Sequence, residues 1–267
     1  MKRGLLLCIM IAGLMTPNVF GRKTETRPVS SFSGINASGI FNITISKGSK
    51  ESLVIEADDK VLPYVRSEVR NGVLHLYLGN DNKLKNVKTL KATVVMKNLD
   101  RVTLSGACKL TSNDTFTPGK FKGDCSGASE MTITLNTGQL NIETSGSCNV
   151  RMKANVTGDT KIDLSGASKI RGDLKAADVK FNISGVSSVE LNGSAKDFKL
   201  NVSGASKVKA EDFVAKDVTV EASGAGKITV HATKTLNVNS SGATSVRYKG
   251  SPTVKLNTGR NGSIKKI

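Results

Sequence analysis

The chain has 267 residues, and 39 Lys and Arg against 22 Asp and Glu give it a formal net charge of +17. A basic field of this size favours anionic partners such as acidic glycans or envelope components. With no Trp and three Tyr, aromatic side chains are scarce for a globular enzyme or for a platform that stacks sugars. Its 26 glycines are typical of short strands joined by tight turns.

Residues 1–21 have the pattern of a secretory signal peptide. Lys2 and Arg3 precede an apolar stretch over residues 5–15, and Gly21 supplies a small residue for cleavage. The apolar stretch is shorter than the roughly 20 residues that cross a bilayer, so we expect no transmembrane segment in the mature chain. We therefore predict export to the periplasm or the cell surface, where nucleic acid is not an expected partner.

The main signal in the sequence is a Ser-Gly dipeptide that recurs at nearly constant spacing. Successive copies lie 18 to 21 residues apart, a regularity that chance does not explain. The serines of the eight copies are Ser105, Ser126, Ser145, Ser165, Ser184, Ser203, Ser223 and Ser241.

Alignment of the copies on this serine exposes apolar columns that are separated by polar positions. Apolar residues stand three positions before the serine, as at Ile142 and Leu200, and five positions after it, as at Val150 and Val208. This period of two indicates strands rather than helices. One copy cannot bury its apolar face alone, so we expect the copies to stack as coils about 4.8 Å apart, each strand pairing with its equivalent in the next copy.

Other architectures fit the repeat less well. A leucine-rich repeat and the nonapeptide Ca²⁺-binding roll need consensus strings that are absent here, and the period of two excludes helical repeats. A β-sandwich or barrel remains the structural alternative, because its strands also recur roughly every 8–12 residues. The preferred prediction is an all-β solenoid with about 19–20 residues per coil.

Before the first of the eight copies the register is weaker. Residues 32–48 alternate as strand, and the Asn71-Gly72 pair predicts a turn into a strand over residues 73–78. Between them we predict one short helix, with Asp58 or Asp59 as its cap. The apolar residues at helical spacing that suggest it are Val61, Leu62, Val65 and Val69.

These features divide the chain into four sections. After the signal peptide, residues 22–98 are interpreted as a β-rich section that opens or caps the solenoid, since a solenoid needs a closed end. Residues 99–257 carry the Ser-Gly repeat, and residues 258–267 are interpreted as a C-terminal cap or tail.

Four stretches are distinctive in combination, namely residues 32–48, 56–65 and 71–76 and the repeated Ser-Gly-Ala-Ser. Together they resemble the autotransporter-adhesin head GIN domain family, which is common in Bacteroidetes, over about residues 30–257. The resemblance implies a right-handed parallel β-helix, similar in shape to pectin lyases and without known catalytic residues. It also implies a role in adhesion.

An outward column two positions before the serine carries carboxylates on three consecutive coils, at Asp124, Glu143 and Asp163. Carboxylates stacked about 5 Å apart would suit a retaining glycosidase, so these are the candidate catalytic residues. The column four positions before the serine carries basic residues, as at Lys122 and Lys161. Acidic and basic columns side by side most simply make a charge-balanced ladder, and we expect no enzyme activity.

A second acidic column stands six positions before the serine. Its oxygens could bind Ca²⁺, although aspartates at this position more simply cap the turn that enters each strand. Its members are Asp159, Asp178, Asp197 and Asp217. The two histidines lie far apart and no Cys/His cluster has metal spacing, so we expect neither a metal nor a cofactor.

A basic column stands four positions after the serine and is the candidate contact for an acidic glycan or an envelope component. It is interrupted by Glu130 and Ser188. Lysines also keep a surface solvated and protect exposed strand edges, which is the simpler explanation. We call this column the basic ladder, and its members are Lys109, Lys169, Lys207 and Lys227.

Three cysteines remain in the mature chain. Cys108 and Cys148 occupy one column two coils apart, so about 9–10 Å separates them. This exceeds the Cα separation of roughly 7 Å that a disulfide tolerates. Because Cys125 lies in a different column, we predict three buried free thiols.

The sequence therefore predicts a non-enzymatic exported scaffold that serves in binding or adhesion. A polysaccharide lyase or hydrolase on one face of the solenoid remains an alternative that rests on fold analogy alone. A structural envelope protein with a protein partner is a further alternative, and self-association into a homo-oligomer stays open.

Overall fold

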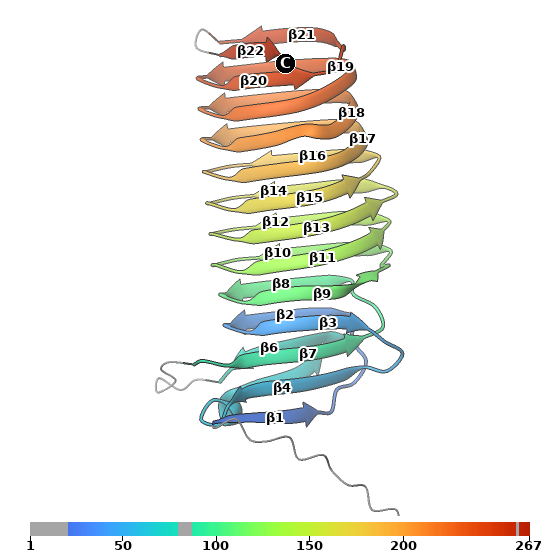
Figure 1. The fold of residues 1–267 in the computed structure, drawn as a ribbon, viewed down its shortest axis with the longest axis vertical. Helices are drawn as coiled ribbons and strands as arrows, with labels where there is room; N and C mark the ends of the chain where they lie inside the picture. Colours follow the sequence, from blue (N-terminus) through green and yellow to red (C-terminus); the bar gives the residue numbers. More distant parts are fainter. Residues whose placement is uncertain (1–20, 80–86, 260–261) are drawn as a thin grey trace, which may run out of the picture.

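The computed structural model describes residues 21–79, 87–259 and 262–267. Nearly all the regular structure in them is strand, and the strands stack along one axis as a β-solenoid of about nine turns (Figure 1). The predicted all-β solenoid is thus confirmed. The predicted signal peptide falls on residues 1–21, of which 1–20 lie outside the described residues.

Each coil contributes one strand to each of two facing sheets, and the Ser-Gly dipeptide forms the corner between them. Sheet 1 holds the strands that precede the dipeptide, which pair in parallel. They are β8 (Arg101–Gly106), β10 (Lys120–Cys125), β12 (Gln139–Thr144), β14 (Asp159–Leu164) and β16 (Asp178–Ile183). Sheet 2 holds the strands that follow it, namely β9 (Lys109–Phe116), β11 (Glu130–Thr137), β13 (Asn149–Val156) and β15 (Lys169–Lys175).

Three longer strands then run through both sheets, their first halves in sheet 2 and their second halves in sheet 1. They are β17 (Ser188–Gly204), β18 (Lys207–Gly224) and β19 (Lys227–Gly242). The last strands of the chain are β20 (Ser245–Lys249), β21 (Thr253–Thr258) and β22 (Ser263–Lys266). Since β22 pairs in parallel with β20, the solenoid continues into the last residues of the chain.

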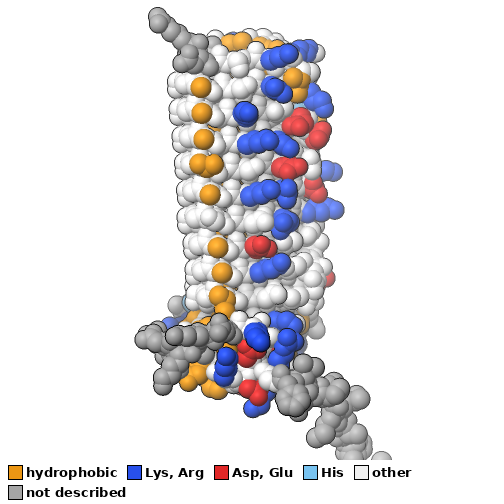
Figure 2. Space-filling view, turned by 60° about the vertical axis from the view of Figure 1, so that its left-hand side comes forward, with side chains coloured by type: hydrophobic (Ala, Val, Ile, Leu, Met, Phe, Trp, Pro, Cys, Tyr) orange, Lys and Arg blue, Asp and Glu red, His pale blue; other side chains and the backbone are white. Residues whose placement is uncertain are grey.

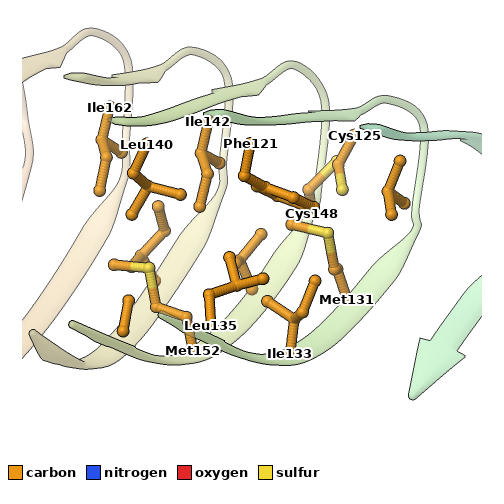
Figure 3. Close-up of a cluster of buried hydrophobic side chains, with 14 of the residues drawn as sticks. Phe121, Cys125, Met131, Ile133, Leu135, Leu140, Ile142, Cys148, Met152 and Ile162 are labelled. Carbon is orange, nitrogen blue, oxygen red and sulfur yellow. The ribbon is translucent and has the colours of Figure 1, made fainter. Parts of the chain in front are cut away.

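The side chains of the two sheets meet in one continuous core. Figure 3 shows Phe121 and Ile142 from sheet 1 facing Met131 and Ile133 from sheet 2. All four are at most 2% exposed. Burial of a side chain of this size stabilises the fold by roughly 1.5–3 kcal/mol, and the columns repeat this burial on every coil.

The Ser-Gly corner needs glycine for two reasons. At Gly185 the φ angle is 85°, in the left-handed region that side chains disfavour. A Cβ atom added there would also lie 2.5 Å from the carbonyl oxygen of Gly166 on the preceding coil. That oxygen accepts a hydrogen bond from the amide of Val186 at 2.9 Å, so the close approach is part of the ladder between coils.

A ninth Ser-Gly copy, Ser38-Gly39, lies before the eight copies of the regular repeat. Strand β2 (Gly34–Gly39) pairs in parallel with β8, which places Ser38 opposite Ser105 and Gly39 opposite Gly106. Strand β3 (Asn42–Lys47) completes this first coil by pairing with β9. The signal was present in the sequence, because Ile35 and Ile43 stand at the same apolar positions as in the later copies.

The chain then reverses and covers the free side of this first coil (Figure 1). Strand β4 (Ser52–Asp58) pairs antiparallel with both β1 (Arg22–Arg27) and β7 (Leu90–Met96), and β7 pairs with β3. The hairpin of β5 (Val65–Arg70) and β6 (Val73–Leu78) extends sheet 1, because β6 pairs with β2. Its turn is the predicted Asn71-Gly72 pair, and both residues have positive φ.

The predicted helix is a single 3₁₀ turn, η1 (Leu62–Tyr64), and is shorter than the apolar spacing suggested. Val65 begins β5, and Val69 lies within that strand. The expectation that both belong to a helix is wrong, because pairing of β5 with β6 outweighs a weak helical pattern. Asp58 does not cap the helix; its Oδ2 accepts hydrogen bonds from the amides of Lys88 and Thr89.

Candidate functional site

Two outward columns on sheet 1 border a groove that runs along the solenoid. One column, two positions before the serine, is called the polar column and comprises Thr103, Asp124, Glu143, Asp163, Asn182, Asn201, Glu221 and Asn239. The other, the serine column, comprises Ser126, Ser145, Ser165, Ser184, Ser203, Ser223 and Ser241. We call the space between them the serine groove, and its volume is about 720 Å³.

The serine groove is long and shallow. It extends from Thr103 to Ser241 over eight coils, which corresponds to roughly 34 Å at the usual spacing of strands. The residues between the two columns, such as Leu164 and Ile183, point their side chains into the core and are 2% exposed. The floor of the groove is therefore formed by the backbone. The wall on the serine side is lower than the wall on the polar side, because serine side chains are short.

The three candidate catalytic residues are stacked as predicted. Asp124 lies opposite Glu143, and Glu143 lies opposite Asp163, in the parallel register of β10, β12 and β14. The neighbouring lysines of the same strands pair with them. Lys122 Nζ lies 3.3 Å from Asp124 Oδ1 and 3.4 Å from Glu143 Oε1, and Lys161 Nζ lies 2.8 Å from Asp163 Oδ2. These are the contacts of a charge-balanced ladder.

The protonation chemistry of this cluster also differs from that of a glycosidase. A glycosidase needs one carboxyl whose pKa is raised so that it can act as an acid. Burial acts to raise the pKa of Asp163, but hydrogen bonds from Lys161 and Asn182 outweigh it and hold this pKa below its ordinary value. Asp124 in turn raises the pKa of Lys122 by accepting its hydrogen bond. Both effects favour the ionised pairs.

Further along the polar column, amide side chains link successive coils. Asn182 Nδ2 donates to Asp163 Oδ1 at 2.5 Å, and Asn201 Nδ2 donates to Asn182 Oδ1 at 2.8 Å. The series stops there, because Asn201 Oδ1 is buried without a hydrogen-bond partner. The next residue in the column is Glu221, whose ionised carboxylate has no hydrogen to donate.

The serine hydroxyls donate hydrogen bonds to backbone carbonyls of the preceding coil. Ser165 Oγ donates to the Thr144 carbonyl at 2.9 Å, and Ser184 Oγ donates to the Leu164 carbonyl at 3.3 Å. A hydroxyl that donates in this way keeps its lone pairs as acceptors. This side of the groove therefore accepts hydrogen bonds on coil after coil.

An exposed row of small apolar side chains runs beside the serine column at the corner of the coils (Figure 2). It stands two positions after the serine, and only glycine lies between the two columns. Val186, its most prominent member, is 67% exposed. We call this row the apolar ridge. Ser147 interrupts it on one coil, and its members are Ile40, Ala107, Ala128, Ala167, Val186, Ala205, Ala225 and Ala243.

The basic ladder lies on sheet 2, away from the serine groove. Its four lysines share one column, but only Lys207 and Lys227 are on adjacent coils. Ser188 separates Lys169 from Lys207, and Lys109 Nζ lies 3.4 Å from Glu130 Oε2. Lysines, arginines and acidic residues alternate over this part of the surface in Figure 2, and none of the four lysines lines the serine groove.

The second acidic column is also stacked, with Asp178 opposite both Asp159 and Asp197. Burial and the hydrogen bond with Asp197 raise the pKa of Asp178, so the stacked carboxylates repel one another. Among residues 21–79, 87–259 and 262–267, no group of three or more His, Cys, Asp or Glu side chains could hold a metal ion.

All three cysteines of the described chain are free and buried, as the register predicts. Cys148 occupies a column in which serine is the usual residue, and it makes the same contact. Its Sγ donates to the Ser145 carbonyl at 3.2 Å, as Ser129 Oγ does to the Ser126 carbonyl at 2.9 Å. The thiols at Cys108 and Cys148 thus belong to the corner structure.

The family model described as "Putative auto-transporter adhesin, head GIN domain" matches residues 31–158 and 141–252. The chain belongs to this family. The two matched ranges together include the first coil, most of the N-terminal section and nearly the whole Ser-Gly repeat. None of the curated proteins compared with the chain matches it.

Solved structures share the fold of this GIN-domain chain. A "putative adhesin" from Parabacteroides merdae has a TM-score of 0.70 at 18% identity and covers 93% of this chain and 97% of its own. A "putative adhesin" from Parabacteroides distasonis has a TM-score of 0.69 at 20% identity, covering 92% and 97%. A "Putative lipid binding protein" from the same organism has a TM-score of 0.60 at 20% identity, covering 93% and 98%. At these identities the likeness concerns the fold alone.

The described part of the GIN-domain chain contains no helix that is long and apolar enough to span a membrane.

The serine groove is a feature that was not predicted from the sequence. Both of its columns are outward positions in the repeat, at Asp163 and Ser165 for example, but neither column predicts a groove by itself. Two outward columns two residues apart, one long and one short, are the signal that could have found it.

Proposed function

We propose that this chain is a non-enzymatic, exported binding module that acts in adhesion at the bacterial envelope. Membership of an adhesin-like family supports a binding role, and the structural relatives described as adhesins share its fold. The observation that carries the proposal is the serine groove, which offers an outward polar side chain on each of eight successive coils and a serine hydroxyl on seven of them. Such a surface suits a long ligand, because contacts that repeat along a chain add through avidity.

The alternative of a lyase or hydrolase has less support. Its candidate residues Asp124, Glu143 and Asp163 are held in ion pairs and a side-chain hydrogen bond with Lys122, Lys161 and Asn182. A ladder of equivalent side chains also offers no unique nucleophile or acid. Replacement of all three carboxylates by their amides should therefore leave any measured turnover of polysaccharides unchanged, and a loss of turnover would restore the enzyme hypothesis.

An acidic glycan contacting the basic ladder is a second candidate for the binding function. The net charge of +17 and the column of Lys109, Lys169, Lys207 and Lys227 favour it. Interruption by Glu130 and Ser188 counts against it, because the positive charges do not form a continuous track. Attraction to such a ladder would weaken with added salt, which distinguishes it from contacts in the serine groove.

Adhesion can be measured with beads coated with residues 22–267. We expect the beads to be retained on envelope fractions or immobilised polysaccharides, and not on an uncoated surface. Retention on none of them would overturn the binding function, and release of new reducing ends from a polysaccharide would overturn the non-enzymatic assignment. Protease treatment of intact cells then separates a surface location, where the protein is digested, from a periplasmic one, where it is protected.

A further inference from the structure

We propose that the serine groove binds an extended, uncharged polysaccharide along the solenoid axis. The inference rests on the proposed binding function and names the ligand class for that site. It differs from the expectation of an acidic glycan on the basic ladder, since it places the ligand on the other sheet and requires an uncharged chain instead of an acidic one.

The arrangement of charges in the groove disfavours an anionic chain. Four members of the polar column are carboxylates, at Asp124, Glu143, Asp163 and Glu221. The lysines that pair with them lie two positions farther from the serine column, on the outer side of the wall. A uronic acid or a phosphate in the groove would therefore meet the carboxylates before it reached the lysines.

The hydrogen-bonding groups suit a chain of hydroxyls. The carboxylates and the back-bonded serines, such as Ser165 and Ser184, accept hydrogen bonds. Asn182 uses one amide hydrogen on Asp163 and keeps the second, so the groove can also donate. A sugar hydroxyl donates and accepts at the same atom, and a polysaccharide repeats it on every unit.

The apolar ridge supplies the second kind of contact that a sugar needs. The C–H face of a sugar ring is apolar, and the ridge of Ala167, Val186 and Ala205 stands exposed along the same edge as the serine column. No side chain rises between them, because only the corner glycines intervene. A flat chain can thus contact the ridge with one face while its hydroxyls meet the two polar columns.

Two other extended ligands fit the groove poorly. A peptide would bind a solenoid by adding a strand to an open edge, but β10, β12, β14 and β16 are each paired on both sides. An acyl chain would cover carboxylates and hydroxyls without offering hydrogen bonds in return, which is unfavourable. A neutral polysaccharide has neither difficulty.

Affinity electrophoresis through gels that contain a soluble polysaccharide tests the proposal. Dextran, mannan and β-glucan serve as uncharged probes, and alginate and polygalacturonate as uronic acid probes. We expect residues 22–267 to be retarded by at least one uncharged probe and by neither uronic acid polymer, and we expect the retardation to persist at raised salt.

A matched pair of substitutions locates the site. Ser184→Arg places a long side chain in the middle of the groove, whereas Ser188→Arg places the same side chain on the basic ladder of sheet 2. Both positions face outward, and Ser203→Arg repeats the first change one coil on in case Ser184→Arg disturbs folding. We expect Ser184→Arg and Ser203→Arg to weaken retardation roughly tenfold or more, and Ser188→Arg to leave it unchanged.

The outcomes separate this inference from the binding function itself. Retardation by an uncharged probe that neither groove substitution weakens overturns the groove as the site and leaves the binding function intact. Retardation by uronic acid polymers alone, lost in Lys169→Ala and Lys207→Ala, overturns the ligand class in favour of the basic ladder. No retardation by any probe also overturns the ligand class, and the bead assay then decides independently whether the chain binds an envelope fraction.

Discussion

Asn201 donates a hydrogen bond from Nδ2 to Oδ1 of Asn182 on the preceding coil, with 2.8 Å between the two atoms. The bond joins two side chains of the polar column and leaves Asn201 Oδ1 itself without a donor. On the next coil stands Glu221, which accepts a 2.9 Å ion-pair contact from Lys199 but cannot donate to Asn201. The amide ladder is interrupted at this step.

Glu221→Asn should therefore stabilise the protein. The new amide can donate to Asn201, a hydrogen bond worth about 0.5–1.5 kcal/mol, while the exposed ion pair with Lys199 that is lost contributes about 0–1 kcal/mol. We expect the melting temperature to rise by roughly 1–3 °C in calorimetry. Glu190→Asn is the control, because it removes an ion pair with Arg171 without extending this ladder. A lower melting temperature for Glu221→Asn would show that the ion pair dominates.

Asp178→Asn should also be stabilising, but only at neutral pH. The pKa of Asp178 is raised in the folded state by burial and by Asp197, so its contribution to stability is present at acid pH and is lost as the pH rises through the folded pKa. At neutral pH the substitution removes a repulsive carboxylate, and we expect a melting temperature about 1–3 °C higher. Below the unfolded pKa of about 3.9 the difference should vanish, because the wild-type carboxyl is then protonated.

A control for this prediction is Asp212→Asn. Asp212 faces Lys249 at 3.8 Å, so its carboxylate is attracted rather than repelled. We expect that change to be neutral or slightly destabilising near pH 7. An equal gain from both substitutions would mean that the stabilisation reflects a general preference for asparagine, and the repulsion within the acidic column would be refuted.

Gly185→Ala should be strongly destabilising. The new methyl group would occupy a backbone conformation with positive φ and lie 2.5 Å from the Gly166 carbonyl oxygen, so the corner of the coil must shift. We expect a loss of at least about 2 kcal/mol, seen as a lower midpoint in urea unfolding. Gly119→Ala, at a position with open space around the new atom, should change the midpoint little. Similar losses at both positions would contradict the special role of the corner.

The cysteines should be unreactive in the folded protein. Burial raises the pKa of Cys125 to about 12 and also raises the pKa values of Cys108 and Cys148 above their ordinary range. At pH 8 the reactive thiolate is therefore scarce. We expect Ellman's reagent to detect almost no thiol in the native mature protein and three after denaturation. Rapid native reaction would contradict this burial, and fewer than three thiols after denaturation would indicate a disulfide.

The repeat could be predicted from the sequence because each outward and inward position meets its equivalent about 19 residues away. Aligning Ser126 with Ser145 is therefore the same operation as pairing β10 with β12. The first coil escaped this reasoning, because the capping strands separate Ser38 from its partner Ser105 by far more than one repeat. The helix was overestimated for a related reason, since the spacing of Val65 and Val69 does not reveal that β6 lies beside them.

The serine groove could not be predicted from the repeat pattern, for a different reason. Its existence depends on relative heights, with a long side chain at Asp163 or Asn182 beside a short one at Ser165 or Ser184. The columns show which residues point outward, but the depth between them arises only when the coils are stacked. The ion pairs of Lys122 and Lys161, in contrast, could be anticipated from two columns of opposite charge on one face.

The stacking of parallel coils also determines how the molecule would respond to mechanical load. The hydrogen bonds between coils lie along the solenoid axis, so tension between its two ends would open them one after another instead of shearing them together. Among the described strands, β1 at one end and β21 and β22 at the other each pair with a single strand, so peeling would begin at the ends. Each released coil of about 19 residues would extend the chain by roughly 60 Å. An attachment built this way would lengthen stepwise under a pull and dissipate energy at each step.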